Sequence, residues 1–205
     1  MTGKNPLRPT RELISRPGDV LEYDRALWRI HRTQGTHRQR WDQLRDFGPL
    51  RSMRWDPHPE PARTQPDWAV CYASPDVETA FAEVFQATRA IHLSAARALV
   101  GWLPSRKLHL LDLTGQWLLR NGASSWLAGG RKDACRNRSH AIRSTWPDLD
   151  GLYVPSSMNG EPSVVLYAPA RDAFPADPQV ARPLNSPALA GTIRHAAAAL
   201  QWPIR

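Results

Sequence analysis

Several side chains of chemically active types are spread along the sequence, and together they suit a nucleotide ligand. Arg29 and Arg54 can each bind phosphate oxygens through two parallel hydrogen bonds. Tyr72 offers an aromatic face to a base or to a nicotinamide ring. A single carboxylate such as Glu83 can bind ribose hydroxyls and stabilise positive charge that develops on a ribosyl carbon. Ser156 adds a hydroxyl in a turn, so the set predicts a nucleotide site.

The residue types alone do not decide the function. The sequence contains no G-x-x-x-x-G-K-[ST] phosphate loop, no G-x-G-x-x-G after a strand and no G-x-S-x-G. Taken singly, each candidate also has a structural interpretation, because arginines form surface ion pairs, tyrosines pack in cores and serines beside prolines form turns. Composition and periodicity therefore leave the function open.

Cysteine, histidine and apolar residues exclude several classes of protein. Cys71 and Cys135 cannot form a disulfide framework, and neither they nor the seven histidines have the spacing of a metal site. We therefore expect no metal. No apolar run approaches the roughly 20 residues of a membrane helix, and the polar N-terminus lacks the apolar stretch of a signal peptide. These features predict a cytoplasmic protein without membrane contact.

The sequence is basic, with a net charge of +8 and a pI of about 10.3. A basic chain invites a nucleic-acid interpretation. Only three of its 27 basic residues are lysines, however, and the arginines are spread along the whole chain instead of forming a stripe with interleaved aromatic residues. We expect no direct nucleic-acid binding, and a surface that attracts an acidic partner or an anionic small molecule.

The elements that would position the candidate residues begin with a strand over 25–31, whose alternation places Arg29 on the face opposite Trp28. A second strand is predicted over 68–73 and contains Tyr72. An amphipathic helix follows over 75–91, with Ser74 as its cap and Glu83 at the margin of its apolar stripe. Four prolines between residues 57 and 66 exclude a helix or a central strand there and predict a surface loop.

The order of the predicted strands and helices indicates a single α+β domain, because they mix without regular βαβ alternation. The predicted units are an irregular extension over 1–24, a main domain over 25–175, and a proline-rich segment with a C-terminal helix over 176–205. Residues 32–52 are predicted to be loop. The further elements expected are strands over 108–113, 151–155 and 163–168 and helices over 132–145 and 189–200.

The candidate residues stand in short motifs whose order resembles the RES domain, a family named for its Arg, Glu and Ser. That family has a first strand with a Trp-Arg or Tyr-Arg pair, an Arg-Trp-Asn-like element, a strand with Tyr, a helix with Glu, and a Gly-Leu-Tyr-x-Pro-Ser-Ser-like turn before a hydrophobic strand. The resemblance covers about residues 25–175. The matching motifs here are Leu27-Trp-Arg-Ile30, Arg54-Trp55-Asp56, Val70-Cys-Tyr-Ala-Ser74, Ala80-Phe-Ala-Glu83, Asp150-Gly-Leu-Tyr-Val-Pro-Ser156-Ser157 and Val164-Val-Leu-Tyr167.

The resemblance implies an ADP-ribosyltransferase-like fold with a mixed β-core and flanking helices. It also implies a toxin that degrades NAD⁺ by hydrolysis or phosphorolysis, with NAD⁺ as substrate, inorganic phosphate as a co-substrate in the second case, and no cofactor. The partner implied is an Xre-like helix-turn-helix antitoxin. The catalytic residues implied are Arg54, Tyr72, Glu83 and Ser156, and those implied for substrate binding are Arg29, Trp55 and Ser157, the last as the alternative to Ser156.

Two features depart from the family pattern: the connection from Arg54 to Tyr72 is lengthened by the proline-rich stretch over 57–66, and Asp56 stands where the family often has Asn. Two other functions stay open at this point. One is a protein ADP-ribosyltransferase that uses the same NAD⁺ site. The other is an inactive, basic protein that binds nucleic acid or acts as a regulator. The acceptor of the ribosyl group and a homo-oligomeric state are also open.

Overall fold

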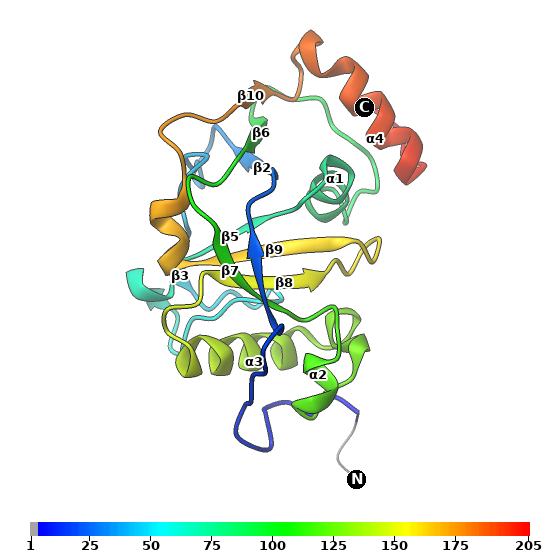
Figure 1. The fold of residues 1–205 in the computed structure, drawn as a ribbon. Helices are drawn as coiled ribbons and strands as arrows, with labels where there is room; N and C mark the ends of the chain where they lie inside the picture. Colours follow the sequence, from blue (N-terminus) through cyan, green and yellow to red (C-terminus); the bar gives the residue numbers. More distant parts are fainter. Residues whose placement is uncertain (1–3) are drawn as a thin grey trace.

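The computed structural model describes residues 4–205 and confirms a single α+β domain built around a five-stranded sheet. Neighbouring strands of this sheet run antiparallel, except that β7 and β8 are parallel. In sheet order the strands are β1 (Val20–Tyr23), β7 (Leu108–Asp112), β8 (Gly151–Pro155), β9 (Pro162–Tyr167) and β5 (Val70–Ala73). Figure 1 shows β8 and β9 as a hairpin whose turn projects at one end of the sheet.

A second sheet has three antiparallel strands, in the order β10 (Val180–Pro183), β6 (Arg97–Trp102) and β2 (Leu27–Arg32). It is joined to the first sheet where β2 meets the end of β5, because Trp28 and Ser74 exchange two backbone hydrogen bonds of 2.8 and 2.9 Å. A two-stranded ribbon of β3 (Phe47–Gly48) and β4 (Arg63–Thr64) closes the proline-rich loop.

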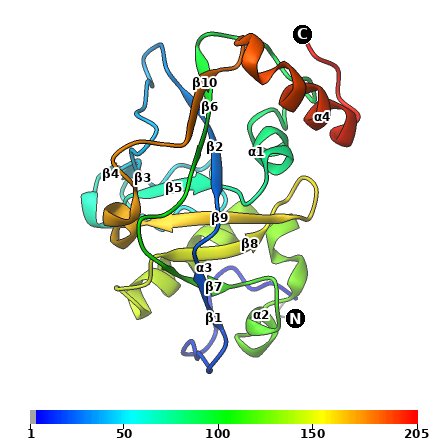
Figure 2. The same ribbon diagram turned by 45° about the horizontal axis from the view of Figure 1, so that its top comes forward.

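The helices lie on different sides of these sheets (Figures 1 and 2). One face of the five-stranded sheet is covered by α3 (Lys132–Thr145), with α2 (Trp117–Arg120) beside it. Helices α1 (Val77–Val84) and α4 (Ala190–Leu200) pack together beside the three-stranded sheet. Short 3₁₀ turns occupy Pro66–Trp68, Ser125–Gly129, Ala168–Ala173 and Pro187–Leu189.

Strand alternation assigns the core side chains to separate clusters. Val70, Leu152 and Val154 point to the face covered by α3, whereas Cys71 and Val164 point to the opposite face. Trp28 and Ile30 pack on α1 and α4 in a third cluster. The predicted alternation of the first strand is therefore confirmed.

The predicted strands over 68–73, 108–113, 151–155 and 163–168 and the helices over 132–145 and 189–200 are confirmed to within two residues at each end. The helix predicted over 75–91 is shorter: α1 ends at Val84, and its cap is Asp76, whose carboxylate accepts a 2.7 Å hydrogen bond from the Thr79 amide. Beyond the helix, Ile91 forms backbone hydrogen bonds with Pro203 and Arg205.

The irregular extension predicted over 1–24 is partly wrong. Residues 4–19 are irregular, but β1 pairs with β7 and so forms the edge of the main sheet. Residues 1–3 of this extension lie outside the described residues. Strands β6 and β10 were also not predicted.

Among residues 4–205, no helix is both long and apolar enough to cross a bilayer. Within the same residues, no group of three or more His, Cys, Asp or Glu side chains is arranged to hold a metal ion.

Candidate active site

Glu83 lies in the last turn of α1, on the side of the helix away from its main apolar contacts. Phe81, two residues earlier, is fully buried against Ile30 and Leu99 of the three-stranded sheet. Because successive helical residues are rotated by about 100°, Glu83 points away from that cluster and toward the β8–β9 hairpin. Its side chain is half-buried there.

Ser156 follows the last residue of β8 and continues its alternation. Leu152 and Val154 face α3, so Ser156 falls on the same side of the sheet. The turn after it is closed by a hydrogen bond from the Gly160 amide to the Ser156 carbonyl (3.2 Å) and by one from the Ser156 amide to the Glu161 carbonyl (2.7 Å). Gly160 has a φ of +80°, a conformation that favours glycine.

The structure joins these two residues directly. The Ser156 hydroxyl donates to Glu83 Oε1 over 2.6 Å and accepts from the Met158 amide over 3.0 Å. Hydrogen bonds to a carboxylate are among the stronger ones in proteins, and Ser156 is only 6% exposed. Within residues 4–205, no hydrogen bond engages Glu83 Oε2. That oxygen is therefore free to accept hydrogen bonds from a ligand.

Tyr72 lies on the same face of the sheet as Ser156, in β5. Its ring is half-buried against the cluster that contains Trp55, and its hydroxyl is buried without a hydrogen-bond partner in the described chain. Burial raises the pKa of Tyr72 above its usual value, so the phenol is neutral at physiological pH. Tyr72 can offer part of its ring to a ligand, but it cannot act as a base.

Arg54 contacts the chain just before α3 and the first turn of that helix. In Figure 1 this is the helix end nearest the end of β8. The Arg54 guanidinium donates to the Gly130 carbonyl over 2.5 Å and lies 4.0 Å from Cys135 Sγ. Because the side chain is half-buried and has no acidic partner among the described residues, it retains donors for an anion. No hydrogen bond joins Arg54 to Glu83 or Ser156 within residues 4–205.

Two of the residues predicted to bind substrate lie in different surroundings: Trp55 is in the core and Ser157 is at the surface. Trp55 is 3% exposed and packs in the core, where its carbonyl accepts from the Ser139 hydroxyl. Ser157 is exposed in the hairpin turn, and it is Ser156 that reaches Glu83.

Arg29 was predicted to face a nucleotide, but its guanidinium is bound inside the protein. Nη1 donates to the Trp41 and Gln43 carbonyls over 2.9 and 3.0 Å, and Nη2 donates to Gln39 Oε1 over 2.8 Å. The residue is only 8% exposed. Its contacts hold the irregular segment 33–46 against β2.

We expect Arg29→Lys to loosen segment 33–46 while the rest of the domain stays folded. An ammonium group cannot reproduce the forked geometry that binds two carbonyls and an amide oxygen at once. Limited proteolysis should therefore cut the variant within this segment much faster than the wild type. Equal cutting rates would contradict the role assigned to Arg29.

Asp56 points into the protein, so its charge does not face the candidate site. It is 0% exposed; Oδ2 accepts from Arg45 Nη2 (2.9 Å) and the Leu50 amide (2.7 Å), and Oδ1 lies 2.5 Å from His58 Nδ1. Burial alone would raise the pKa of Asp56, but the His58 hydrogen bond and the Arg45 charge hold that pKa below its usual value. The proline-rich stretch therefore folds away beside a buried ionic cluster.

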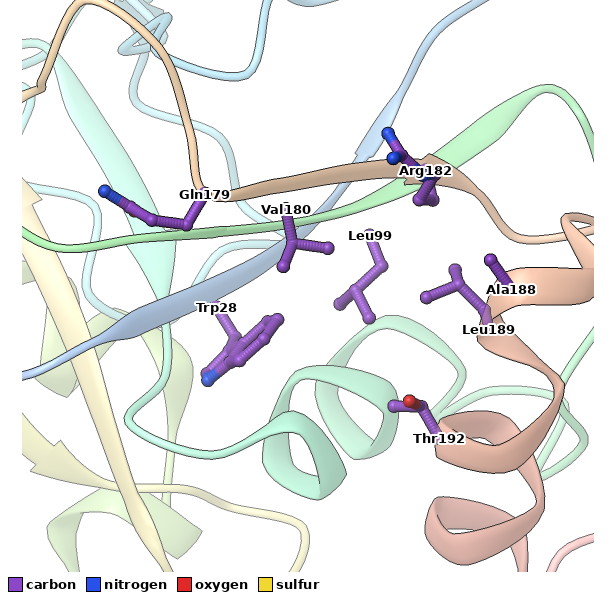
Figure 3. Close-up of a pocket in the computed structure, with 8 residues that line it drawn as sticks. All are labelled: Trp28, Leu99, Gln179, Val180, Arg182, Ala188, Leu189 and Thr192. Carbon is purple, nitrogen blue, oxygen red and sulfur yellow. The ribbon is translucent and has the colours of Figure 1, made fainter.

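An open groove of about 270 Å³ lies elsewhere, between the three-stranded sheet and α4 (Figure 3). The Trp28 indole and the Leu99 side chain line it from the sheet, and Arg182 lies at its edge. Glu83 and Ser156 take no part in this groove.

Two further residues, Asn159 and Thr79, join the hairpin turn to α1, and the sequence does not identify them as a pair. Asn159 Nδ2 donates to Thr79 Oγ1 over 2.9 Å, which adds a second side-chain contact between the hairpin turn and α1. Asn159-Gly160 signals a turn, but nothing in the sequence identifies a helical threonine as its partner. Thr79 and Glu83 are one helical turn apart and so lie on one face.

Comparison with known proteins gives two matches. A family model described as RES domain matches residues 26–188. Among solved structures, a chain from the crystal structure of the M. tuberculosis MbcT–MbcA toxin–antitoxin complex is 20% identical, with a TM-score of 0.55, over 86% of this chain and 92% of that one. At this level of identity the likeness shows a common fold. No curated protein matches the sequence.

Proposed function

The chain belongs to the RES-domain family, and on that premise we propose that it is a toxin that cleaves the bond between nicotinamide and ribose in NAD⁺. The observation that carries the proposal is the hydrogen bond between Ser156 and Glu83, which are 73 residues apart in the sequence. This bond engages Glu83 Oε1 and leaves Oε2 free beside the Ser156 hydroxyl. A free carboxylate oxygen is the acceptor that ribose hydroxyls need. The half-buried Arg54 guanidinium and the partly exposed Tyr72 ring are the supporting groups.

In the proposed reaction, Glu83 Oε2 accepts hydrogen bonds from the hydroxyls of the nicotinamide ribose. As the bond between the ribosyl carbon and the ring nitrogen breaks, its electron pair passes to the positively charged ring, and nicotinamide leaves neutral. The Glu83 carboxylate stabilises the ribosyl cation that develops. Arg54 binds the pyrophosphate, and the Tyr72 ring packs beside the nicotinamide.

The ribosyl carbon then forms a bond to an oxygen of water or of inorganic phosphate. With water the product is ADP-ribose and a proton is released; with phosphate it is ADP-ribose 1″-phosphate. The positively charged nicotinamide ring is a competent leaving group by itself. The proposal therefore needs no cofactor, only NAD⁺ and the acceptor.

The test is to incubate the purified protein with NAD⁺, with and without inorganic phosphate, and to measure nicotinamide and the ADP-ribose products. We expect nicotinamide release, and its dependence on phosphate distinguishes phosphorolysis from hydrolysis. Label from [³²P]NAD⁺ on a protein band would instead indicate a protein ADP-ribosyltransferase. A folded protein that releases no nicotinamide would overturn the proposal.

We further propose that the chain is neutralised by an antitoxin partner. The solved structure that resembles it is a toxin–antitoxin complex, and the net charge of +8 favours an acidic partner surface. Co-expression with the product of the neighbouring gene should restore growth and yield a complex that elutes as one species. Unchanged growth arrest and separate elution would contradict this proposal.

A further inference from the structure

The hairpin turn after β8 and the face of α1 are joined by two side-chain hydrogen bonds. The first is between Ser156 and Glu83 (2.6 Å), and the second is between Asn159 and Thr79 (2.9 Å). The helix residues are four apart and the turn residues are three apart, so the two bonds run side by side between the same two segments. We name this pair of contacts the hairpin clasp.

The side-chain amide of Asn159 makes one hydrogen bond to the helix and one within the turn. Nδ2 donates to Thr79 Oγ1, and Oδ1 accepts from the Glu161 amide over 3.2 Å. The Glu161 carbonyl in turn accepts from the Ser156 amide. The conformation of the turn and its distance from α1 are therefore coupled through one side chain.

On the helix, Thr79 is fixed in position by burial and by a backbone hydrogen bond. It is 0% exposed, and its amide donates to the Asp76 cap over 2.7 Å. Its hydroxyl is consequently fixed relative to the start of α1, one turn before Glu83. A bond from this hydroxyl to Asn159 fixes where the turn, and with it Ser156, meets the helix.

We propose that Asn159 and Thr79 are positioning residues that set which oxygen of Glu83 faces the substrate. Because the Met158 amide donates to Ser156 Oγ, the serine hydrogen is directed to Glu83 Oε1. Oε1 is then occupied by the protein and Oε2 is presented to the ligand. Without the Asn159–Thr79 bond, the turn can move along the helix, and the carboxylate loses this fixed orientation. The inference rests on the proposed NAD⁺ cleavage for its effect on catalysis.

The test compares Thr79→Val with Thr79→Ser. Valine has the shape of threonine but no hydroxyl, and the exposed Asn159 amide can turn to water, so the fold should persist. Serine keeps the hydroxyl but loses a buried methyl group, which lowers stability. We expect kcat for nicotinamide release to fall about 10- to 100-fold in Thr79→Val, with little change in KM. It should stay near the wild-type value in Thr79→Ser, although this variant melts at the lower temperature.

A second variant and a second measurement make the outcome decisive. Asn159→Ala removes the donor to Thr79 together with the acceptor for the Glu161 amide, and it should lose kcat like Thr79→Val. Amide hydrogen exchange over residues 156–161 should be faster in both of these variants and unchanged in Thr79→Ser. Full kcat in Thr79→Val, or equal loss in Thr79→Val and Thr79→Ser, would overturn the inference.

Hydrogen exchange also separates this inference from the proposed function. If the wild type released no nicotinamide, the proposed reaction would fail, but the exchange rates could still be compared. Unchanged exchange in Thr79→Val and Asn159→Ala would then overturn the clasp itself.

Discussion

Replacing Glu83 by Gln should lower the rate of nicotinamide release about 100- to 1,000-fold and abolish toxicity, while the protein stays folded. The amide oxygen of Gln can still accept the hydrogen bond from Ser156, so the local packing is kept. The negative charge that would stabilise the ribosyl cation is removed, and losing one electrostatic stabiliser of a transition state typically has an effect of this size. The measurement is kcat for nicotinamide release beside the thermal melting curve.

Glu78→Gln is the matched control, because it makes the same chemical change on the same helix. Glu78 lies in the first turn of α1 and its carboxylate is 3.4 Å from His195, on the side of α4. We expect this variant to keep wild-type activity. A Glu83→Gln protein as active as the wild type, or an equal loss in both variants, would remove Glu83 from the proposed mechanism.

The largest effect on stability is expected from Asp56→Asn. Asp56 is completely buried between Arg45, whose side chain is 15% exposed, and His58, whose side chain is buried. Removing one partner of a buried ionic cluster leaves the other charge uncompensated, which typically costs about 3 kcal/mol of unfolding free energy. For a domain of this size that corresponds to a fall in Tm of about 6–12 °C. Thermal unfolding followed by circular dichroism measures it.

The pH dependence gives the same prediction a second test. The pKa of Asp56 in the folded protein is below its usual value. The carboxylate therefore contributes stability above the unfolded-state pKa of about 3.9, and this contribution is lost as the pH falls through the folded-state pKa. The difference in stability between wild type and Asp56→Asn should be largest at neutral pH and shrink below about pH 4. A difference that does not depend on pH would contradict the charge explanation.

Asp42→Asn provides the control for this stability effect. Asp42 pairs with Arg40, but the Arg40 side chain is 77% exposed, and exposed ion pairs contribute about 1 kcal/mol or less. Its Tm should therefore change by less than about 4 °C. A fall as large as that of Asp56→Asn would show that burial is not what distinguishes the two carboxylates.

The elements with strong local signals could be predicted from the sequence. Helix α3 has the predicted bounds, because its periodic residues end before Pro147, and β8 begins at Gly151 as expected. The strands that were missed depend on distant partners: Tyr23 of β1 pairs with Leu108 of β7, and neither sequence alone indicates that pairing. Short strands of mixed composition gain their stability from such neighbours.

The site was only partly predictable. The order of short motifs identified Glu83 and Ser156, which the structure brings into contact. The same reasoning assigned Arg29 to a phosphate, since the sequence gives no sign that an aperiodic segment would bind its guanidinium through two backbone carbonyls. The burial of Trp55 was not predictable for a related reason: a tryptophan beside an arginine can lie in a core or in a site, and the sequence does not distinguish the two.

The topology of the main sheet has a consequence for the synthesis of the protein on the ribosome. Strand β5 pairs within that sheet only with β9, and Glu83 precedes Ser156 by 73 residues. At about 5–20 residues per second, Glu83 is made roughly 4–15 seconds before the hydroxyl that orients it. A nascent chain that has reached α3 therefore carries the carboxylate but neither its neighbouring turn nor the strand that completes the sheet. Translation products that end before Ser156 lack this hydroxyl, so the proposed mechanism predicts that they are inactive.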